Sequence, residues 1–581
     1  MIRAISRREF MKGMMIGGAA VGSAGLLAAC GTSSSSSESS ADSSTSSSAS
    51  TDESSTEATQ ETTTEREKLV VVLQQNTYIN DYDDNYLTHY LEEKLGIEIE
   101  FYLLPADGSE ACTKLSLMAT DPSSLPDVLV ASIGLSDMEI LNYGQNGIFM
   151  DLTDYLADPE KTPNWNAIPD EDREIMETAS TQADGRIYSL IRYEPELWNL
   201  TPYHLFINRA WLDTLGLELP TTTEELKDVL IAFRDGDPNG SGVQDEIGVW
   251  GYSSGGYGQN TIKALMNSFI FWPDSNDGLI ATEDGSTIIP AWTQDEFKEG
   301  LLYLNDLYNE KVLDPSIFTV DDTQFKATLN AETNVVGLVS IGSTSNYSDA
   351  NNNANFVEME MMPVLKGPKG VAWSPQSVYS GTQASFVFAN TDKADLAVKF
   401  LDEFYSYTTS MTARYGEEGV DWTTDEDVCA QAWNVWVDMG IFDRVKLYVY
   451  TSWWSTNSSQ FWHNVGIRYA SLEDANTKSD TLLDEVDTSL ATTYNMTDAY
   501  EFYYEAHPEH LVPGLKYTAE EVEANTDAMT NIPDHVSQSI AEFVTGARDI
   551  ETEWDTYLAE LDAMGLQGWL EAAQAAYDRT K

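Results

Sequence analysis

The stretch "KLVVVLQQN" (residues 68–76) decides the fold class. It is a short, continuous apolar run that ends in polar residues, which is typical of a buried strand in a parallel sheet. Apolar residues with helical spacing follow over residues 86–95, and Gly96 stands where a helix C-cap is expected. From Ile97, "IEIEFYL" alternates apolar and polar residues, which predicts a strand with one buried face.

The same order continues along the chain. A helix-like segment around residues 114–120 precedes "LPDVLVA" (residues 125–131), which we interpret as a third buried strand. The order β-α-β-α-β predicts an open α/β sheet with right-handed crossovers. Ligands of such sheets bind outside the carboxyl ends of the strands. Gln75 and Asn76, which directly follow the first strand, are therefore candidate ligand-binding residues.

Later stretches predict further elements. "NVVGLVSI" (residues 334–341) is a buried-strand candidate, and residues 385–406 form a strand followed by an amphipathic helix. The C-terminal part is helical in pattern from about Asn525. One face of its longest expected helix carries four apolar residues, namely Trp554, Tyr557, Leu558 and Leu561.

The N-terminus predicts export and anchoring. Residues 1–29 have the basic start and modest apolar run of a signal peptide, with a twin-arginine-like "SRREFMK". The run is too short and too rich in glycine and alanine for a membrane span. "LAAC" (residues 27–30) resembles the bacterial lipobox, in which the thiol of the cysteine, here Cys30, is acylated, for example with palmitate. Residues 30–67 are almost all Ser, Thr, Ala, Asp and Glu, so a disordered tether is expected there.

Charge limits the partners. The net charge is −63, from 95 acidic and 32 basic residues, which argues against nucleic acid as a partner. It also makes a polyanionic ligand unlikely without a local basic pocket. The length beyond the tether predicts two or more lobes. Beyond Cys30 the chain has two cysteines, Cys112 and Cys429, and both a disulfide and two buried thiols fit their spacing.

A calcium-loop motif occurs at "RDGDPNGSGVQDEIG" (residues 234–248). From Asp235 it matches every specified position of the EF-hand template D-x-[DN]-x-[DN]-G-x5-E. A capping box at Thr222 and Glu225 predicts a helix before the loop. The stretch "IGVWGYS" after it predicts a strand, whereas an EF-hand needs a second helix.

Several stretches together resemble one family. They are "LAAC", "GIFMDLTDYL", "DGRIYSL", "FINRAWLDTLGLELPTTTEEL", "DPNGSGVQDEI", "RYGEEGVDW" and the ending "EFVTGARDIETEWDTYLAELDAMGLQGWLEAAQAAYDR". In this order they are similar to the extracellular solute-binding lipoproteins of carbohydrate ABC importers (family 1, the large oligosaccharide-binding group). The resemblance implies a type II periplasmic-binding-protein-like fold, with two α/β lobes, hinge crossovers and a ligand cleft between the lobes.

The resemblance also implies a division of the chain and a setting. Lobe 1 comprises residues 68–195 and a return at residues 366–445, lobe 2 comprises residues 196–365 with the calcium loop, and the helical residues 446–581 pack on both lobes. The expected protein is a non-catalytic monomer on the outer face of the cell membrane, held there by its lipid anchor. It would pass an oligosaccharide to the transmembrane subunits of an ABC permease.

The family pattern D-P-N-G-N-G-x-x-D-E-I changes the register of the loop. It implies a structural Ca²⁺ bound by the carbonyl of Val243 and five side chains, those of Asp237, Asn239, Ser241, Asp245 and Glu246. Ser241 stands where the family usually has Asn. Oxygen donors at alternate positions suit calcium. The EF-hand register would instead begin at Asp235 and omit Asp245, and an acidic turn without an ion is the remaining alternative.

A sugar site needs aromatic platforms and a few oriented hydrogen-bonding groups. Several tryptophans stand in polar stretches of the sequence, although core packing is an alternative for each of them. With Gln75 and Asn76, the candidate ligand-binding residues are Arg192, Trp198, Trp272, Trp373, Trp453 and Trp454.

Two other functions fit parts of the sequence. An anchored glycoside hydrolase would need two carboxyl groups about 5 to 9.5 Å apart, which the sequence alone does not locate. The same binding fold could take a peptide or another polar solute. His507 and His510 in "HPEH" are better explained by a loop than by a metal site, and six His offer few candidates for a Ser-His-Asp triad.

Overall fold

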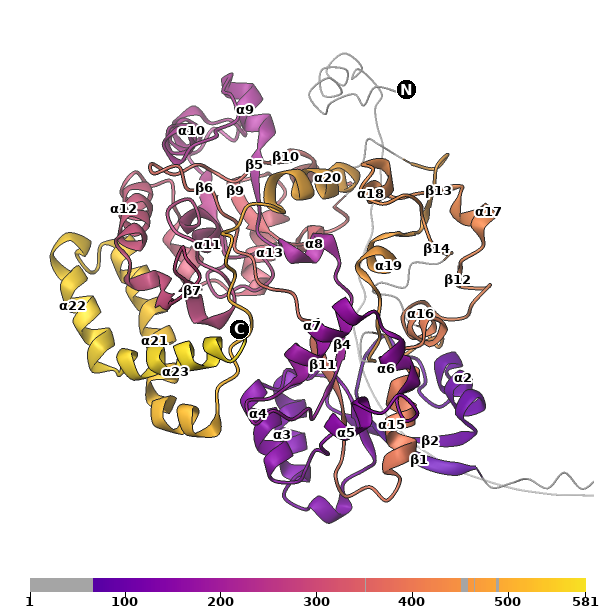
Figure 1. Cartoon of the computed structure of the whole chain (residues 1–581). Coiled ribbons are helices and arrows are strands. Elements are labelled where there is room, and N and C mark those ends of the chain that lie inside the picture. The colour runs from indigo at the N-terminus through magenta and orange to yellow at the C-terminus, as the bar shows by residue number, and fades with distance from the viewer. Residues whose placement is uncertain (1–65, 351, 451–457, 464–465, 487–490) are drawn as a thin grey trace, which may run out of the picture. The chain divides into compact units, whose positions relative to one another are not determined.

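The computed structural model describes residues 66–350, 352–450, 458–463, 466–486 and 491–581 (Figure 1). The predicted signal peptide, Cys30, all but the last two residues of the predicted tether, and Trp453 and Trp454 lie outside the described residues.

A five-stranded sheet is built around the stretch at residues 68–76. Its strand order is β2-β1-β3-β11-β4. The strands are β1 (Glu67–Gln74), β2 (Ile97–Leu104), β3 (Val128–Val130), β4 (Leu190–Arg192) and β11 (Thr382–Val387). β1 is parallel to both β2 and β3, as predicted, whereas β11 is antiparallel to β3 and to β4. The sheet is therefore mixed.

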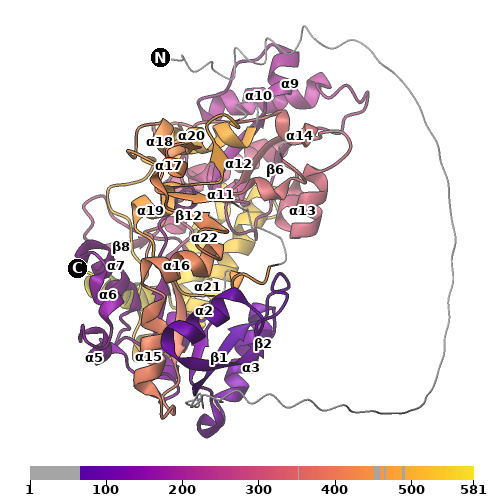
Figure 2. The same cartoon turned by 90° about the vertical axis from the view of Figure 1, so that its right-hand side faces the viewer.

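The apolar run in β1 is buried on both faces of this sheet. Alternate side chains point to opposite faces of a strand, so Leu69, Val71 and Leu73 join one core cluster while Val72 joins another. The first face is covered by α2 (Tyr86–Leu95) and α15 (Ala394–Glu403), which lie beside β1 and β2 in Figure 2. The second face is covered by α3 (Gly108–Met118) and α4 (Asp137–Gln145).

Local signals explain where the first helices begin and end. α2 has the predicted bounds, because the Asn85 side chain caps its start and Gly96 takes the left-handed conformation at φ 71°. The segment predicted around residues 114–120 is in fact the end of α3. This helix begins at Gly108, because the Asp107 side chain accepts a hydrogen bond from the backbone N–H of Glu110.

A second, four-stranded sheet has the order β10-β5-β9-β6. Its strands are β5 (His204–Asn208), β6 (Ile247–Trp250), β9 (Val336–Ile341) and β10 (Met359–Met361). β6 and β9 are parallel, and the strand predicted after the calcium-loop motif is β6. Every residue of β5 is buried, with Leu205 and Ile207 in one core cluster and Phe206 in another.

Helices cover this sheet and extend its core. Four belong to the middle of the chain: α9 (Arg209–Leu215), α10 (Thr223–Gly236), α11 (Thr261–Met266) and α12 (Asp295–Asn309). Three more are C-terminal: α21 (Ala519–Thr545), α22 (Ile550–Ala563) and α23 (Leu566–Asp578), yellow in Figure 1. Trp569 of α23 stacks on Trp292 with ring centroids 6.3 Å apart. The C-terminal helices therefore share the core of the second sheet.

The C-terminal part is helical, as predicted, but its first long helix begins earlier than residue 525. Trp554, Tyr557 and Leu561 are buried on α22, as predicted. The longest helix is α21 rather than α22, and it begins at Ala519 because a capping box joins Thr518 and Glu521. Ahead of α21, Lys516 forms an ion pair with Asp137 at the start of α4. This ion pair links the C-terminal part to the first sheet.

A third region, between residues 407 and 503, holds short strands that the sequence pattern did not predict. They are β12 (Trp422–Thr423), β13 (Ala432–Trp433), β14 (Leu447–Val449), β15 (Lys478–Ser479) and β16 (Thr481–Leu482). Its helices are α16 (Tyr407–Tyr415), α17 (Glu426–Cys429), α18 (Val435–Asp438), α19 (Leu472–Asn476) and α20 (Ala491–Tyr503). The remaining elements are α5 (Thr153–Leu156), α6 (Pro163–Ala167), α7 (Asp170–Ser180), α8 (Leu197–Leu200), α13 (Asp322–Leu329), α14 (Ala354–Val357), β7 (Leu279–Ala281) and β8 (Ile288–Pro290).

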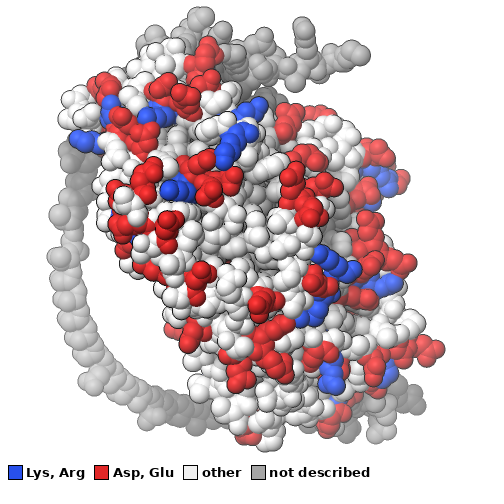
Figure 3. All heavy atoms as spheres, turned by 60° about the vertical axis from the view of Figure 1, so that its left-hand side comes forward, with Lys and Arg blue, Asp and Glu red and all other residues white. Residues whose placement is uncertain are grey.

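The thiols and the surface complete the description. Cys112 and Cys429 are free thiols rather than a disulfide. Among the residues described, no helix combines the length and the apolar character needed to cross a membrane. Asp and Glu outnumber Lys and Arg on the face drawn in Figure 3, in keeping with the net charge of −63.

Candidate ligand-binding region and metal loop

The two sheets are joined by residues 193–196, which we call the crossing segment. It leaves β4 of the first sheet and leads through α8 into β5 of the second. The third region holds it by main-chain hydrogen bonds, from the N–H of Tyr193 to the carbonyl of Arg468 at 3.0 Å and from the N–H of Ala470 to the carbonyl of Tyr193 at 2.9 Å.

Two carboxylates of the crossing segment are paired with cations from the third region. Glu194 Oε2 lies 3.2 Å from Arg414 Nη1 and 2.8 Å from Arg468 Nε. Glu196 Oε1 lies 3.0 Å from Arg414 Nη2 and also pairs with Lys478. The side chains of Arg468 and Glu194 are only 1 % and 9 % exposed. This buried cluster fixes the crossing segment between the two sheets.

The electrostatics of the cluster favour the charged forms. Burial alone would raise the pKa of Glu194, but the guanidinium groups of Arg414 and Arg468 outweigh burial and hold this pKa at about 2. Arg192, a predicted ligand-binding residue at the end of β4, also lowers the pKa of Glu194. Arg192 thus contributes to the internal charge balance of this region.

Three other predicted ligand-binding residues flank the crossing segment or follow β1. Trp198, on α8, donates its indole N–H to the carbonyl of Gly342 at 3.0 Å and is partly buried. Gln75 and Asn76 directly follow β1, as predicted, and Gln75 is exposed. The side-chain oxygen of Asn76 accepts from the N–H of Tyr78 at 2.9 Å, so it stabilises a local turn.

Trp272 and Trp373 are brought together by Asn267, the residue that follows α11. The buried side chain of Asn267 accepts from the N–H of Trp272 at 3.0 Å and donates to the carbonyl of Trp272 at 3.1 Å. The carbonyl of Asn267 accepts from the N–H of Trp373 at 3.1 Å. Both indoles are partly buried, and Trp272 lines a pocket together with Lys263 and Trp292.

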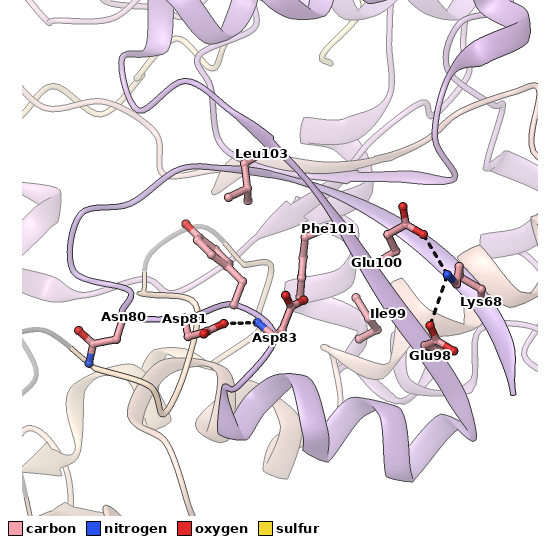
Figure 4. A pocket seen from close by; sticks show the side chains of 10 residues that line it. Lys68, Asn80, Asp81, Asp83, Glu98, Ile99, Glu100, Phe101 and Leu103 are labelled. Carbon is pink, nitrogen blue, oxygen red and sulfur yellow. Dashed lines mark hydrogen bonds and ion pairs between the residues drawn. The ribbon is translucent and has the colours of Figure 1, made fainter. Parts of the chain in front are cut away.

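Another hollow lies at the outer edge of the first sheet (Figure 4). Lys68 and a group of acidic residues line it, and Lys68 pairs with Glu98 at 3.3 Å and with Glu100 at 3.1 Å. None of the predicted ligand-binding residues lines this hollow. Its one cation is already paired, so we do not assign the ligand to it.

Sequence reasoning missed Tyr257, which lies close to Trp198. The residue is 43 % exposed, and its backbone is left-handed at φ 49°. Its hydroxyl donates to Asn199 Oδ1, and its carbonyl accepts from the N–H of Gly342 at 3.0 Å. The sequence signal was the context G-G-Y-G, because neighbouring glycines permit tight backbone turns.

The backbone of the predicted metal loop turns tightly between α10 and β6. Asp237 takes a left-handed conformation at φ 47°, directly after the last residue of α10, and Gly240 and Gly242 have φ 70° and 75°. β6 begins at Ile247, so a strand stands where an EF-hand has its second helix.

The residues expected to bind calcium lie close together in this loop. The N–H of Gly242 donates to both carboxylate oxygens of Asp237, at 3.3 and 3.2 Å. Asn239 Nδ2 and Ser241 Oγ each lie 2.9 Å from the same oxygen of Asp245. Ser241 Oγ also lies 3.0 Å from the carbonyl oxygen of Val243.

The surroundings of the Glu246 carboxylate indicate whether these residues fit a cation. Both of its carboxylate oxygens are buried, and neither has a hydrogen-bond partner among the described residues. Burial raises the pKa of Glu246, and the nearby carboxylates of Asp245 and Asp237 raise it further. A cation beside Glu246 would satisfy these buried oxygens and offset the repulsion, so the donor set fits Ca²⁺.

Asp235 behaves differently from the other acidic residues of the motif. It accepts two hydrogen bonds from the guanidinium of Arg234, at 2.8 and 2.9 Å, and is thereby paired outside the loop. This pairing favours the register that begins at Asp237. Within the described residues, no three His, Cys, Asp or Glu side chains cluster tightly enough to hold a metal by themselves. The expected site therefore depends on the amide, hydroxyl and carbonyl donors as well.

Two α/β lobes with a crossing segment between them define a type II periplasmic-binding-protein-like fold, as predicted. Residues 76–409, more than half of the chain, match the family described as bacterial extracellular solute-binding proteins. The chain belongs to this family.

Named relatives are similar over most of their length. The fructooligosaccharide ABC transporter substrate-binding protein FusA of Streptococcus pneumoniae serotype 4 is 26 % identical over 508 residues, which cover 86 % of this chain and 88 % of FusA. A structure of a FusA EF-hand mutant in complex with fructo-nystose has a TM-score of 0.68 at 22 % identity, covering 88 % of this chain and 99 % of that one.

A second relative is an HMO-binding, ABC-transporter-associated solute-binding protein from Bifidobacterium longum infantis ATCC 15697. Its structure has a TM-score of 0.68 at 21 % identity and covers 89 % of this chain and 99 % of that one. At these identities the two structures establish the fold. FusA is a substrate-binding protein, and the Bifidobacterium protein is a solute-binding protein.

Proposed function

We propose that this protein captures an oligosaccharide outside the cell and delivers it to an ABC importer, without catalysing a reaction. The observation that carries the proposal is the end-to-end similarity to FusA, a fructooligosaccharide-binding protein of an ABC transporter. The fold supplies what capture requires, because two lobes joined by a short crossing segment can close on a ligand by hinge motion.

The ligand would lie near the crossing segment, where the lobes are joined. Gln75 and Asn76 follow β1 at its carboxyl end, and Arg192 and Trp198 flank the crossing segment. Aromatic rings would pack on the apolar C–H faces of a sugar, and the amide and guanidinium groups would bind its hydroxyls. Trp272 and Trp373, which both bond Asn267, and the predicted Trp453 and Trp454 complete the candidate set.

The proposal includes the predicted setting. Cys30 would carry the lipid that anchors the protein to the outer face of the cell membrane, and residues 30–67 would form the tether. Residues 68–195 and 366–445 would form lobe 1, and residues 196–365 would form lobe 2. Residues 446–581 would pack on both, which the ion pair of Lys516 with Asp137 supports. The protein would act as a monomer with the permease subunits as partners.

We also propose that the loop from Asp237 to Glu246 binds a structural Ca²⁺. The buried, unpartnered oxygens of Glu246 support it, and so does the EF-hand named in the FusA structure. Calcium would join the end of α10 to the start of β6 within lobe 2. The ion would therefore stabilise the lobe rather than act as a signal.

Titration calorimetry tests the proposed function. The full-length chain is titrated with nystose, lacto-N-tetraose, trigalacturonate and a set of short peptides, and the sugar that binds is then analysed for cleavage. Binding of at least one oligosaccharide without cleavage is the expected result. Binding of peptides alone would contradict the carbohydrate assignment, and released shorter sugars with turnover would favour a glycoside hydrolase.

A further inference from the structure

We propose that the ring of Tyr257 is a rigid platform that stacks on a ring of a neutral sugar. This inference rests on the proposed function and goes further in two ways. It names a residue that no sequence motif marked, and it states that the sugar is uncharged. Three independent features of Tyr257 support it: its place in the fold, its unfavourable backbone and the way its ring is held.

Tyr257 lies where ligands of α/β sheets bind. It belongs to the loop that follows the carboxyl end of β6, and its carbonyl accepts from Gly342, which directly follows the carboxyl end of the neighbouring parallel strand β9. Ligands of such sheets bind outside the carboxyl ends of the strands. Its hydroxyl reaches Asn199 on α8, directly after the crossing segment. The ring therefore lies beside the junction of the two lobes.

The backbone of Tyr257 is unfavourable for its side chain. A left-handed φ of 49° is uncommon for bulky residues and persists only where the surroundings impose it. Here the next residue, Gly258, approaches the carbonyl of Pro202 so closely that a Cβ would lie 1.9 Å from it. Residues with such strained backbones cluster at active sites and ligand clamps.

Tyr257 is exposed, yet its ring is held in place. The residue is 43 % exposed, and its hydroxyl donates to Asn199 Oδ1 while Asn199 Nδ2 donates to Glu196 Oε2 at 2.7 Å. The ring edge also packs against Gly342, where an added Cβ would come within 2.8 Å of its Cδ1. A ring that is already ordered loses little freedom when a ligand binds, which favours affinity.

The charges around Tyr257 favour a neutral sugar over a uronate. Arg414, Arg468 and Lys478 are paired with the carboxylates of the crossing segment. Glu196, which is linked to Tyr257 through Asn199, is one of these carboxylates, so Arg414 and Lys478 are already engaged beside the ring. An acidic sugar would also meet repulsion from a chain with net charge −63.

The test replaces Tyr257 with glycine in the full-length chain. Glycine accepts a positive φ without strain, so Tyr257→Gly removes the ring without straining the backbone. Titration calorimetry with nystose and lacto-N-tetraose is expected to give an affinity about tenfold lower than that of the wild type. Tyr257→Phe keeps the ring and should stay within about threefold of the wild type.

A matched control is Tyr407→Ala. Tyr407 is 41 % exposed at the start of helix α16, and its replacement should leave the affinity unchanged. If the wild type binds a neutral sugar and Tyr257→Gly binds it equally well, the platform is overturned while the proposed function stands. Preference of the wild type for trigalacturonate would overturn the neutral-sugar assignment. If the wild type binds none of these sugars, both the proposed function and this inference fail.

Discussion

The carboxylate of Glu194 lies 2.8 Å from Nε of Arg468, and both side chains are almost completely buried. Arg414 approaches the same carboxylate oxygen to 3.2 Å. One carboxylate of the crossing segment thus meets two guanidinium groups from a region more than 200 residues later in the chain. The pairing ties the junction of the lobes to the third region, and removing the carboxylate would leave two buried cations with less compensation.

We therefore expect Glu194→Gln to destabilise the protein by about 3 kcal/mol, because breaking a buried ion pair leaves an uncompensated charge. Urea unfolding measures the change. The matched control is Glu98→Gln, which removes an exposed partner of Lys68 and should cost less than about 1 kcal/mol. Equal, small effects of the two substitutions would show that the buried cluster contributes little.

The same pair predicts how stability depends on pH. The usual pKa of a glutamate side chain is 4.5, and in the folded protein that of Glu194 is about 2. A depressed pKa contributes stability that is fully present above pH 4.5 and is lost as the pH falls towards 2. The contribution amounts to about 3 kcal/mol.

The difference in thermal midpoint between the wild type and Glu194→Gln should therefore be large at pH 6 and should shrink towards pH 3. Differential scanning calorimetry at several pH values measures it. A difference in thermal midpoint that stays constant from pH 6 to pH 3 would show that protonation of Glu194 does not cause this pH dependence.

Local signals in the sequence predicted the parts of the fold that depend on neighbouring residues. The apolar run from Leu69 to Leu73 and the cap at Gly96 placed β1 and the end of α2 correctly. The starts of α3 and α21 were missed, although their capping residues Asp107 and Thr518 are readable in the sequence. These errors came from giving apolar spacing more weight than capping chemistry.

Other features depend on contacts between distant residues, which sequence patterns do not encode. β11 lies between β3 and β4 although it follows them by about 190 residues or more in the chain, so the mixed sheet could not be predicted. Strands of two residues, such as β12, carry no periodicity. The same distinction holds for the candidate site. The spacing of the loop motif predicted the calcium donors. The exposure of Tyr257 and the charge cluster of the crossing segment could be recognised only from the folded structure.

Calcium should stabilise the protein through the loop that begins at Asp237. A chelator such as EGTA should lower the thermal midpoint, and calcium should restore it, because the cation compensates the buried carboxylate of Glu246. Asp237→Ala should abolish the response. Asp235→Asn is the matched control, since Asp235 pairs with Arg234 and should not bind the ion. Loss of the response in Asp235→Asn would favour the EF-hand register, and no response in the wild type would make the loop a simple turn.

Glu246 gives an independent test in the calcium-free protein. Its pKa is raised by burial and by Asp245 and Asp237, so the folded state binds a proton more readily than the unfolded state. Without calcium, this residue therefore favours folding more at low pH, and its contribution declines as the pH rises through its folded pKa. Glu246→Gln should raise the thermal midpoint of the calcium-free protein at pH 7 and weaken its response to calcium. A lower midpoint for the variant in EGTA would contradict this reasoning.

The side chain of Asn267 should be essential for the arrangement of Trp272. Asn267→Ala removes the side chain that bonds both the N–H and the carbonyl of Trp272, and leaves these partly buried groups without this partner. The expected cost is about 2 kcal/mol in urea unfolding.

The matched control for this substitution is Asn309→Ala. Asn309 lies on α12 and donates an exposed hydrogen bond to Asn305 at 2.9 Å, so its replacement should change stability by less than about 0.5 kcal/mol. Calorimetric titration with nystose at a temperature where Asn267→Ala is folded then reports on Trp272. If Trp272 contacts the sugar, as proposed, the affinity should fall together with the stability. An unchanged affinity in a destabilised Asn267→Ala variant would remove Trp272 from the ligand site and leave Asn267 a purely structural role.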